Sequence, residues 1–326
     1  MTWELFAGNR LALMTWFGTK GERMFSMAQQ WRDIDKVRRK PDSVEHWDNR
    51  SITYGKEDDN RQAHDAYVTE FIEKMRLDKP SIILDMGCGT GLLAIPLAKQ
   101  GHGVIAADFS KGMLARLRED AEKAGVQVVL PCKDERTGMM QMPDAQGGFI
   151  IPLRMSWDDD WGSFGLRENI VDVALASRSI ITHDLEDSLR KLSRVARSRI
   201  CVTANLGAPP KVNPEIARVM GVTLDSRNDA VFVFGVAHEL GYEPEVSYIH
   251  SPRVRTYSSR DEAYHSLLKT LDYIDPEAEQ VDLETAKQRL RDWLLVHLVP
   301  GEVEGTWRLD KPQIVPWAFL CWDVRK

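Results

Sequence analysis

The chain has 326 residues, of which 43% are hydrophobic and 28% charged, and its formal net charge is −6. This composition is typical of a globular protein, and the length fits one α/β domain with insertions or two small domains. The acidic balance excludes a broadly basic nucleic-acid-binding surface, although a local basic patch stays open.

Cysteine usage and apolar runs indicate the compartment. The four cysteines are scattered and form no CxxC pair, which favours free thiols in a reducing cytoplasm over a disulfide framework. No apolar run approaches the roughly 20 residues that a membrane helix needs. The N-terminal stretch lacks the basic start and the cleavage site of a signal peptide. We therefore expect a cytoplasmic protein with no membrane partner.

Residues 1–62 are predicted to form a helical arm rich in tryptophan. Its tryptophans are Trp3, Trp16, Trp31 and Trp47. Pro41 follows a charged stretch and is expected to end a helix. We expect the tryptophans to be aromatic core, with a substrate wall or an oligomer interface as the alternatives.

From residue 63 the sequence alternates between helical and strand patterns. Ala63, Tyr67, Phe71 and Met75 recur at four-residue steps, which predicts a helix with one apolar face. Further helices are expected at 91–101, 110–125, 183–197 and 230–241. Strands are expected at 81–86, 103–110, 149–155, 171–177, 199–205, 245–251 and 316–324.

Several residues are expected to mark the ends of these elements. Ser110 and Asp184 are predicted N-caps, and Gly125 is a predicted helix stop. Pro96 is expected to distort its helix, and Pro316 fits a strand only at its start. For the third strand, 149–155 is preferred over 126–130.

The alternation predicts an α/β, doubly wound fold whose mostly parallel sheet has seven strands and is covered by helices on both faces. Two insertions interrupt it. The first, 207–229, holds Pro209, Pro210 and Pro214. The second, 258–306, is a helical cap with two apolar helical patterns, Ala263/Leu267/Leu271 and Leu283/Ala286/Leu290/Trp293. Both leave from strand carboxyl ends or the nearby sheet edge, where ligands bind in open sheets, and they are interpreted as a substrate cap. The predicted parts are an arm or lid at 1–62, a core at 63–256, a helical cap at 257–306 and a final strand at 307–326.

A glycine-rich loop, "ILDMGCGTG" at 83–91, follows the first strand and opens a helix. Glycines let a ligand approach the main chain, and the first helical N–H groups point toward it. The dinucleotide fingerprint has a third glycine where this chain has Leu92. Asp85 would repel a pyrophosphate but suits a cationic amine. Asp108, at the end of the next strand, can accept from ribose hydroxyls.

An amine at one end and a ribose at the other describe S-adenosylmethionine better than NAD, which disfavours a nicotinamide oxidoreductase. The plainer alternative for Asp108 is a helix-capping or surface acid.

The stretches "ILDMGCGTGLLAIPLAKQG" and "VIAADFSKGMLARLRE" resemble the class I S-adenosylmethionine-dependent methyltransferases, in their small-molecule, ubiquinone/menaquinone-biosynthesis-like branch. The resemblance covers roughly residues 63–250 and the last strand. It implies a Rossmann-like sheet with the last strand antiparallel, S-adenosylmethionine as cofactor and S-adenosylhomocysteine as product.

The resemblance also implies the role of each motif residue. The methionine part of the cofactor would be held by Asp85, Gly87, Cys88, Gly89 and Gly91. Asp108 would bind the ribose, and Phe109 and Met113 would flank the adenine. The remaining residues that the resemblance places at the cofactor are Trp157 and Asp158 near the adenine amine, Ser177 beside the methyl group, and Trp47, in "EHWDNRS", folded over the cofactor.

The chemistry needs alignment of a nucleophile with an already activated methyl donor, and orientation alone contributes roughly 7–11 kcal/mol. No catalytic triad or metal is therefore required. His183 is the first candidate for a general base, and Tyr54 is a weaker one. Arg178 is a candidate for holding an anionic substrate group. The plainer alternatives are a solvated or structural His183 and an ion-paired Arg178.

Other reactive-looking residues have plain interpretations. Cys88 is expected to be a small loop filler rather than a nucleophile. "WDDDW", at 157–161, is expected to be a solvated loop rather than a metal site, since no histidine stands at ligand spacing.

The sequence thus predicts a methyltransferase that acts on a small molecule by direct displacement, with no nucleic-acid partner and with a homodimer as a further expectation. Two rivals stay open. One is an RNA or protein methyltransferase. The other is a non-catalytic S-adenosylmethionine-binding sensor or assembly subunit. No motif identifies the methyl acceptor.

Overall fold

The computed structural model describes residues 26–38, 43–52, 61–143, 147–210, 212–225, 228–275, 278 and 282–324. Its strands are β1 Ile82–Met86, β2 Gly103–Asp108, β3 Gln127–Val128, β4 Phe149–Arg154, β5 Val171–Ser177, β6 Ala196–Asn205, β7 Glu245–Arg253, β8 Thr256–Tyr257, β9 Leu298–Pro300, β10 Trp307–Leu309 and β11 Gln313–Asp323. Its α-helices are α1 Met27–Arg38, α2 Val44–Arg50, α3 Arg61–Met75, α4 Ala94–Lys99, α5 Lys111–Lys123, α6 Leu185–Val195, α7 Pro214–Met220, α8 Asp229–Glu239, α9 Arg260–Leu268 and α10 Leu283–His297.

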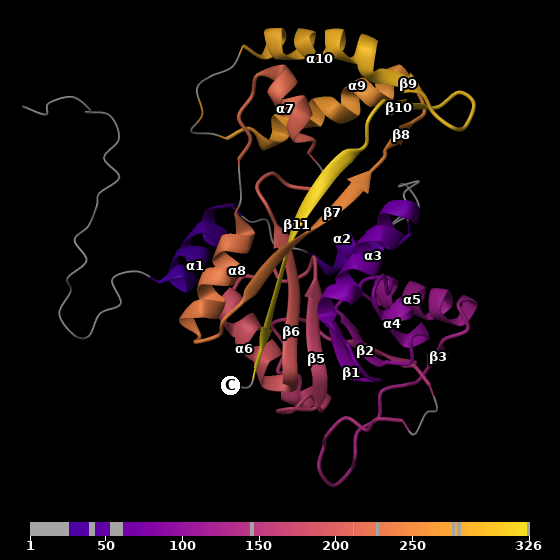
Figure 1. Cartoon of the computed structure of the whole chain (residues 1–326), viewed down its shortest axis with the longest axis vertical. Coiled ribbons are helices and arrows are strands. Elements are labelled where there is room, and N and C mark those ends of the chain that lie inside the picture. Colours follow the sequence, from indigo (N-terminus) through magenta and orange to yellow (C-terminus); the bar gives the residue numbers. More distant parts are fainter. Residues whose placement is uncertain are drawn as a thin grey trace, which may run out of the picture.

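The main sheet is a doubly wound, mostly parallel Rossmann-like sheet, as predicted (Figure 1). Its strand order is β3-β4-β2-β1-β5-β6-β11-β7, and β11 runs antiparallel to both of its neighbours. The predicted count of seven strands is wrong by one. The segment that was passed over for the third strand adds β3, a two-residue edge strand paired with β4.

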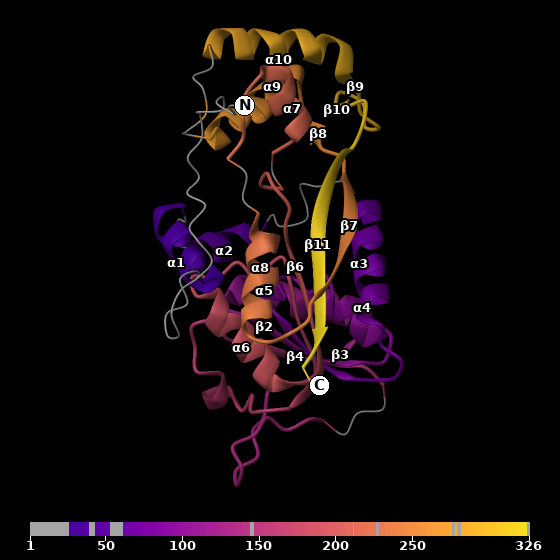
Figure 2. The same ribbon diagram turned by 60° about the vertical axis from the view of Figure 1, so that its left-hand side comes forward.

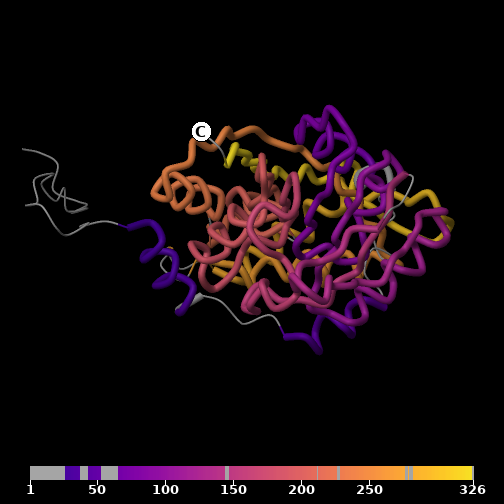
Figure 3. Tube along the Cα trace, turned by 90° about the horizontal axis from the view of Figure 1, so that it is seen from below, coloured from indigo at the N-terminus to yellow at the C-terminus, as the bar shows by residue number. Residues whose placement is uncertain are grey.

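Helices cover both faces of this sheet. On one face α1, α6 and α8 pack around Trp31, Leu189 and Val233, and on the other α3, α4 and α5 pack around Phe71, Leu97 and Leu117. The central strands are therefore buried on both sides, which explains their nearly continuous apolar sequences. Viewed from below, α1 lies at the periphery of the core (Figure 3).

The predicted N-caps are confirmed, whereas the predictions for Pro96 and Pro316 are wrong. The side chains of Ser110 and Asp184 cap α5 and α6. The helix after the glycine loop begins only at Ala94, so Pro96 lies in its first turn, where the missing N–H costs little. Pro316 lies inside β11, not at its start. It is tolerated because β6 begins to pair with β11 only at the next residue, Trp317.

Two helices of the arm, α1 and α2, are each fastened to the core. Trp31 of α1 is buried, as the core interpretation predicts, and its Nε1 donates to the carbonyl of Thr182 at 2.8 Å. Asp48 of α2 accepts from the Ser110 hydroxyl at 2.6 Å and from the Gly112 N–H at 3.1 Å. Trp3, Trp16 and Pro41 lie outside the described residues.

A third hydrophobic cluster is formed by elements that lie beyond the carboxyl ends of the parallel strands (Figure 2). It joins α7, α9 and α10 with the small sheet β8-β10-β9, around Met220, Leu267 and Leu290. Leu283, expected on the apolar face of its helix, is instead exposed at the first position of α10. The division of the chain into parts stays a prediction.

Candidate functional site

A cavity of about 800 Å³ opens at the carboxyl edge of the sheet, between the arm and the core loops. This volume is within the range of small-molecule sites. The predicted site residues that line it are Trp47, Asp85, Gly87, Cys88, Gly89, Asp108, Phe109, Met113, Trp157, Asp158, Ser177, Arg178 and His183. Gly91 is not among the lining residues, and Tyr54 lies outside the described residues.

The glycine loop is tied to the end of β2. The N–H groups of Gly87 and Cys88 donate to the carbonyl of Ala107 at 2.8 and 3.0 Å, and that of Gly89 donates to Asp108 Oδ2 at 2.9 Å. The two acids of the motif are therefore held at one end of the cavity.

The three glycines are needed for different reasons. A Cβ at Gly87 would lie 2.4 Å from the Cβ of Ser179, and one at Gly91 would lie 3.1 Å from Ile95 and Leu117 side-chain atoms. A Cβ at Gly89 would meet nothing within 4 Å. Only Gly89 therefore leaves open space beside the cavity, whereas the other two allow close packing inside the protein.

Asp85 is a buried carboxylate at the base of the cavity. Its residue is 2% exposed, and among the described residues no hydrogen-bond donor contacts its side chain. Burial, with a smaller contribution from the Asp108 charge, raises the pKa of Asp85 to about 7. Such a carboxylate needs either a proton or a cation, so the site fits a ligand with an ammonium group.

Asp108 is buried beside it and is more fully partnered. Its Oδ1 accepts from the Ser110 N–H and its Oδ2 from the Gly89 N–H, both at 2.9 Å. Burial raises the pKa of Asp108 against the opposing effect of these donors. Each carboxylate oxygen has further lone pairs, so the group can still accept from a hydroxyl in the cavity.

The remaining predicted cofactor residues flank the two acids. Met113 is buried, and Phe109 is partly exposed. Trp157 packs against Trp161 with ring centroids 5.6 Å apart. The acids of the 157–161 loop help to shape it, because Asp159 accepts from the Ser156 N–H and Asp160 caps a short 3₁₀ helix. The hydroxyl of Ser177 pairs with Tyr67 at 2.8 Å.

His183 lies at the mouth of the cavity and has a partner that the sequence did not predict. Its Nδ1 is 2.7 Å from Oδ2 of Asp35, which lies on α1 and also lines the cavity. The Asp35 side chain is 8% exposed and that of His183 is 65% exposed. A carboxylate on Nδ1 fixes the imidazole and leaves Nε2 to act as a base.

Parts of the chain are similar in sequence to known proteins. Residues 83–164 match the family model described as a methyltransferase domain. An uncharacterized protein of Haemophilus influenzae is 32% identical over 139 residues, which are 43% of this chain and 42% of that protein. A ubiquinone biosynthesis O-methyltransferase of Dinoroseobacter shibae is 50% identical over 46 residues, 14% of this chain and 18% of that protein. The 18S rRNA (guanine-N(7))-methyltransferase bud23 of Schizosaccharomyces pombe is 35% identical over 86 residues, 26% and 31% of the two chains.

The chain carries a class I S-adenosylmethionine-dependent methyltransferase domain. The stretch that matches the family model begins inside β1, includes the glycine loop and Asp108, and ends just after the 157–161 loop. The chain spans less than half the length of these three relatives.

Cys88 of the methyltransferase domain is not placed to act as a nucleophile. Burial raises the pKa of its thiol well above the usual value, and the nearby Asp85 and Asp108 charges raise it further. The reactive thiolate is therefore disfavoured, in keeping with a loop-filling role.

Gly89→Ala should have two effects that can be measured separately: a loss of stability from backbone strain, and a loss of ligand affinity from the methyl group that it places beside the cavity. Gly89 has φ of 55°, so alanine should cost about 1–2 kcal/mol of stability in this left-handed region. Its methyl group would also enter the open space beside the cavity, so binding of S-adenosylhomocysteine should weaken at least tenfold. Urea unfolding and titration calorimetry measure the two effects.

Gly101→Ala is the matched control for this variant. Gly101 has φ of 93°, nothing within 4 Å of a built Cβ, and no place in the cavity lining. It should lose similar stability and keep full affinity. Equal affinities in the two variants would show that the space at Gly89 is not used by the ligand.

The sequence did not point to two residues of this region, Asp35 and Asp48. Both lie in the arm, where no spacing rule relates an acid to the core. Asp35 orients His183, and Asp48 docks α2 onto the N-terminus of α5, which brings Trp47 to the cavity wall.

Proposed function

We propose that this protein is an S-adenosylmethionine-dependent methyltransferase that transfers a methyl group to a small molecule by direct displacement. The observation that carries the proposal is the pairing of the buried Asp85 with the partnered Asp108 at one end of a single cavity. When bound, the cofactor supplies an activated methyl group on a sulfonium. Asp85 would hold its ammonium group and Asp108 its ribose hydroxyls.

The other lining residues would orient the reactants and exclude water. Phe109, Met113 and Trp157 give the cavity apolar and aromatic walls beside Asp108. Trp47, fixed by α2, would cover the cofactor from the arm side. His183, held by Asp35, would take a proton from a hydroxyl acceptor as the bond to carbon forms.

A small acceptor is supported by three observations. The cavity is compact and its described lining comes from the arm and the core. The net charge is −6, which disfavours a nucleic-acid substrate. The chain also resembles a ubiquinone biosynthesis O-methyltransferase over a short, well-matched stretch.

Among the described residues, no helix has both the length and the apolarity needed to cross a bilayer. A cytoplasmic location and a homodimer stay predictions.

A thermal-shift comparison tests the cofactor assignment. Saturation with S-adenosylmethionine or S-adenosylhomocysteine at 100 times the dissociation constant should add about 2.7 kcal/mol to the folding stability. NAD should give no shift, and Asp108→Ala should reduce the shift given by the first two ligands. A shift with NAD alone would overturn the assignment.

Catalysis is tested by following methyl consumption across a panel of small acceptors. Formation of S-adenosylhomocysteine that depends on one of them supports the enzyme. Tight cofactor binding with no turnover on any acceptor would instead favour a binding subunit, and turnover on RNA or protein alone would move the acceptor to a macromolecule.

A further inference from the structure

Arg178 has an unusual setting at the end of β5. It directly follows the last strand residue, Ser177, and has φ of 60°, in the left-handed region that non-glycine residues rarely adopt. Its N–H donates to the Thr203 hydroxyl at 3.0 Å, and Tyr67 binds the same hydroxyl at 2.9 Å. The strained backbone is therefore held by a network of buried hydroxyls, as occurs at functional sites.

The Arg178 guanidinium is held between two aromatic rings. Its central carbon lies 3.7 Å from the ring centroid of Tyr67 and 4.7 Å from that of Trp317. Tyr67 is fully buried and Trp317 is 7% exposed. Stacking between rigid rings fixes the plane of the guanidinium and thus the direction of its forked donors.

This guanidinium has no acidic partner in the described part of the chain. Other arginines there are paired, such as Arg190 with Glu186 at 2.8 Å and Arg197 with Asp172 at 2.9 Å. Arg178 lines the cavity, and its buried Nε has no hydrogen-bond partner among the described residues. The predicted alternative of a structural ion pair is therefore wrong, and the positive charge is available to a ligand.

The sheet order places this charge on the acceptor side of the site. β6 and β11 lie on one side of β5, whereas β1 and β2, which carry Asp85 and Asp108, lie on the other. Arg178 reaches toward Trp317 on β11, and thus away from the end of the cavity where Asp108 would bind the ribose.

The charge balance of the cavity favours a monoanion. Its lining includes the acids Asp35, Asp85, Asp108 and Asp158, which would repel a phosphate dianion. Lys36 is the other cation of the lining besides Arg178, and its ammonium group already pairs with Asp33 at 3.6 Å, so the acids still outnumber the cations. One planar guanidinium with fixed donors instead matches the two oxygens of a carboxylate. Resting on the proposed function, we propose that the methyl acceptor is a carboxylic acid whose carboxylate is bound by Arg178, stacked between Tyr67 and Trp317.

Binding measurements on the intact protein loaded with S-adenosylhomocysteine test this proposal. The probes are benzoate, phenylacetate and indole-3-acetate, chosen for the aromatic cavity wall, together with their primary amides and phenyl phosphate. Ligand-observed NMR should show that at least one carboxylate binds about 10- to 100-fold more tightly than its amide, as expected for a charged hydrogen-bonded pair. Arg178→Gln should remove this preference, and Arg178→Lys should restore only part of it.

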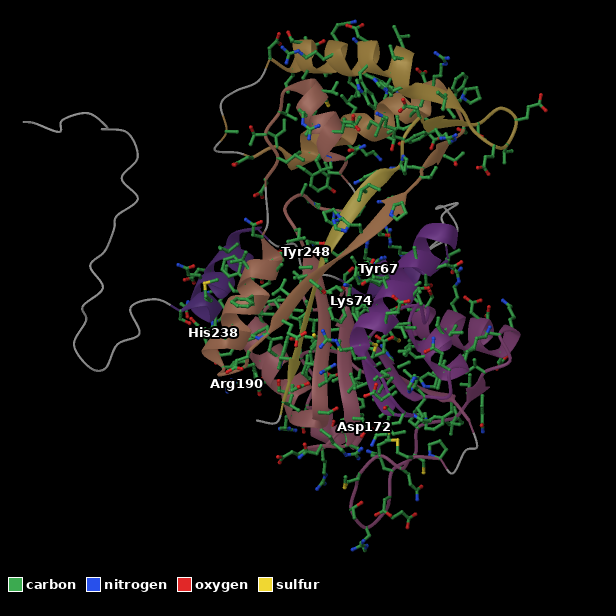
Figure 4. All side chains as sticks on the ribbon, viewed as in Figure 1. Tyr67, Lys74, Asp172, Arg190, His238 and Tyr248 are labelled. Carbon is green, nitrogen blue, oxygen red and sulfur yellow. The ribbon has the colours of Figure 1, made fainter. Side chains whose placement is uncertain are left out.

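Arg190→Gln is the matched control, because Arg190 lies on α6 away from Tyr67 (Figure 4) and its side chain is 62% exposed. It should leave the preference intact. The proposal is overturned if no carboxylate is preferred over its amide, if phenyl phosphate binds best, or if the preference survives in Arg178→Gln.

Calorimetry with S-adenosylhomocysteine separates this proposal from the proposed function. If the wild type does not bind S-adenosylhomocysteine, the proposed function is wrong. If it binds S-adenosylhomocysteine but does not prefer carboxylates over their amides, only the proposed role of Arg178 is wrong. If Arg178→Gln, with unchanged circular dichroism, weakens S-adenosylhomocysteine as strongly as the carboxylate probes, the guanidinium serves the cofactor's own carboxylate and the proposal fails.

Discussion

Asp85→Asn should weaken binding of S-adenosylhomocysteine by roughly 10- to 100-fold and, in the same variant, stabilise the ligand-free protein at pH 8. The affinity falls because a charge-assisted hydrogen bond to the ligand ammonium group, worth about 1.5–3 kcal/mol, is lost. The stability rises because the variant removes a buried carboxylate that no described donor contacts. Calorimetry and urea unfolding measure the two opposite effects.

The free energy of unfolding of the ligand-free protein should depend on pH because of the same buried carboxylate. The folded pKa of Asp85, about 7, lies above the ordinary aspartate value of 3.8, so the folded state holds the proton where the unfolded state has released it. The free energy of unfolding should therefore fall as pH rises from about 4 to about 7, and this component should level off above that. Asp85→Asn should remove most of this fall.

The affinity for the cofactor should change with pH in the opposite direction to the stability and weaken as pH falls. A cationic ligand favours the ionised carboxylate, so binding below pH 7 must displace a proton from Asp85. The affinity of the wild type should then weaken as pH falls from 8 to 6, by no more than tenfold per unit for a single proton. An affinity with the same pH dependence in wild type and Asp85→Asn would exclude Asp85 as the ammonium partner.

Asp172→Asn is a matched control from the opposite end of the same region of the sheet. Asp172, labelled in Figure 4, accepts from the Ile82 N–H at 2.8 Å and pairs with Arg197 at 2.9 Å. Loss of these contacts should lower the stability, the reverse of Asp85→Asn, without changing the affinity. The comparison separates an acid that stabilises the fold from one held ready for a ligand.

The core was predictable because its signals are local. Apolar runs, the caps at Ser110 and Asp184, and the glycine loop each act within one βαβ unit, and the parallel topology follows from their alternation. The short helix α7 was missed although Asn213 and Pro214 mark its start, with Asn213 capping it through its side chain. Two further prolines just before it, Pro209 and Pro210, obscured that signal.

Most of the predicted site belongs to the core, and Trp47 is its one predicted residue from the arm that lines the cavity. Asp85, Gly89 and Asp108 come together because strand ends of a parallel sheet meet at one edge. Asp35 reaches the same cavity from the arm, far away in sequence, through the tertiary packing of Trp31 against the loop after β5. Nothing in "RDIDKVRRKPDS" distinguishes this acid from the other charged residues of the same stretch.

His183→Ala should lower turnover by about 10²- to 10⁴-fold on a hydroxyl acceptor and leave the affinity for S-adenosylhomocysteine unchanged, because a general base acts in the transition state and not in cofactor binding. Asp35→Asn should also lower turnover, since it removes the carboxylate that orients the imidazole and stabilises its protonated form. The measurement is kcat with the acceptor that the panel identifies.

The double variant tests whether His183 and Asp35 act as one unit. If they do, removing both should cost little more than removing His183 alone, since the effects of coupled groups do not add. His238→Ala is the control, because His238 lies on α8, stacks on Phe234 and is not part of the cavity lining. It should leave kcat unchanged. If His183→Ala keeps full turnover but loses stability, the pair fastens α1 to the loop after β5, and the acceptor needs no base.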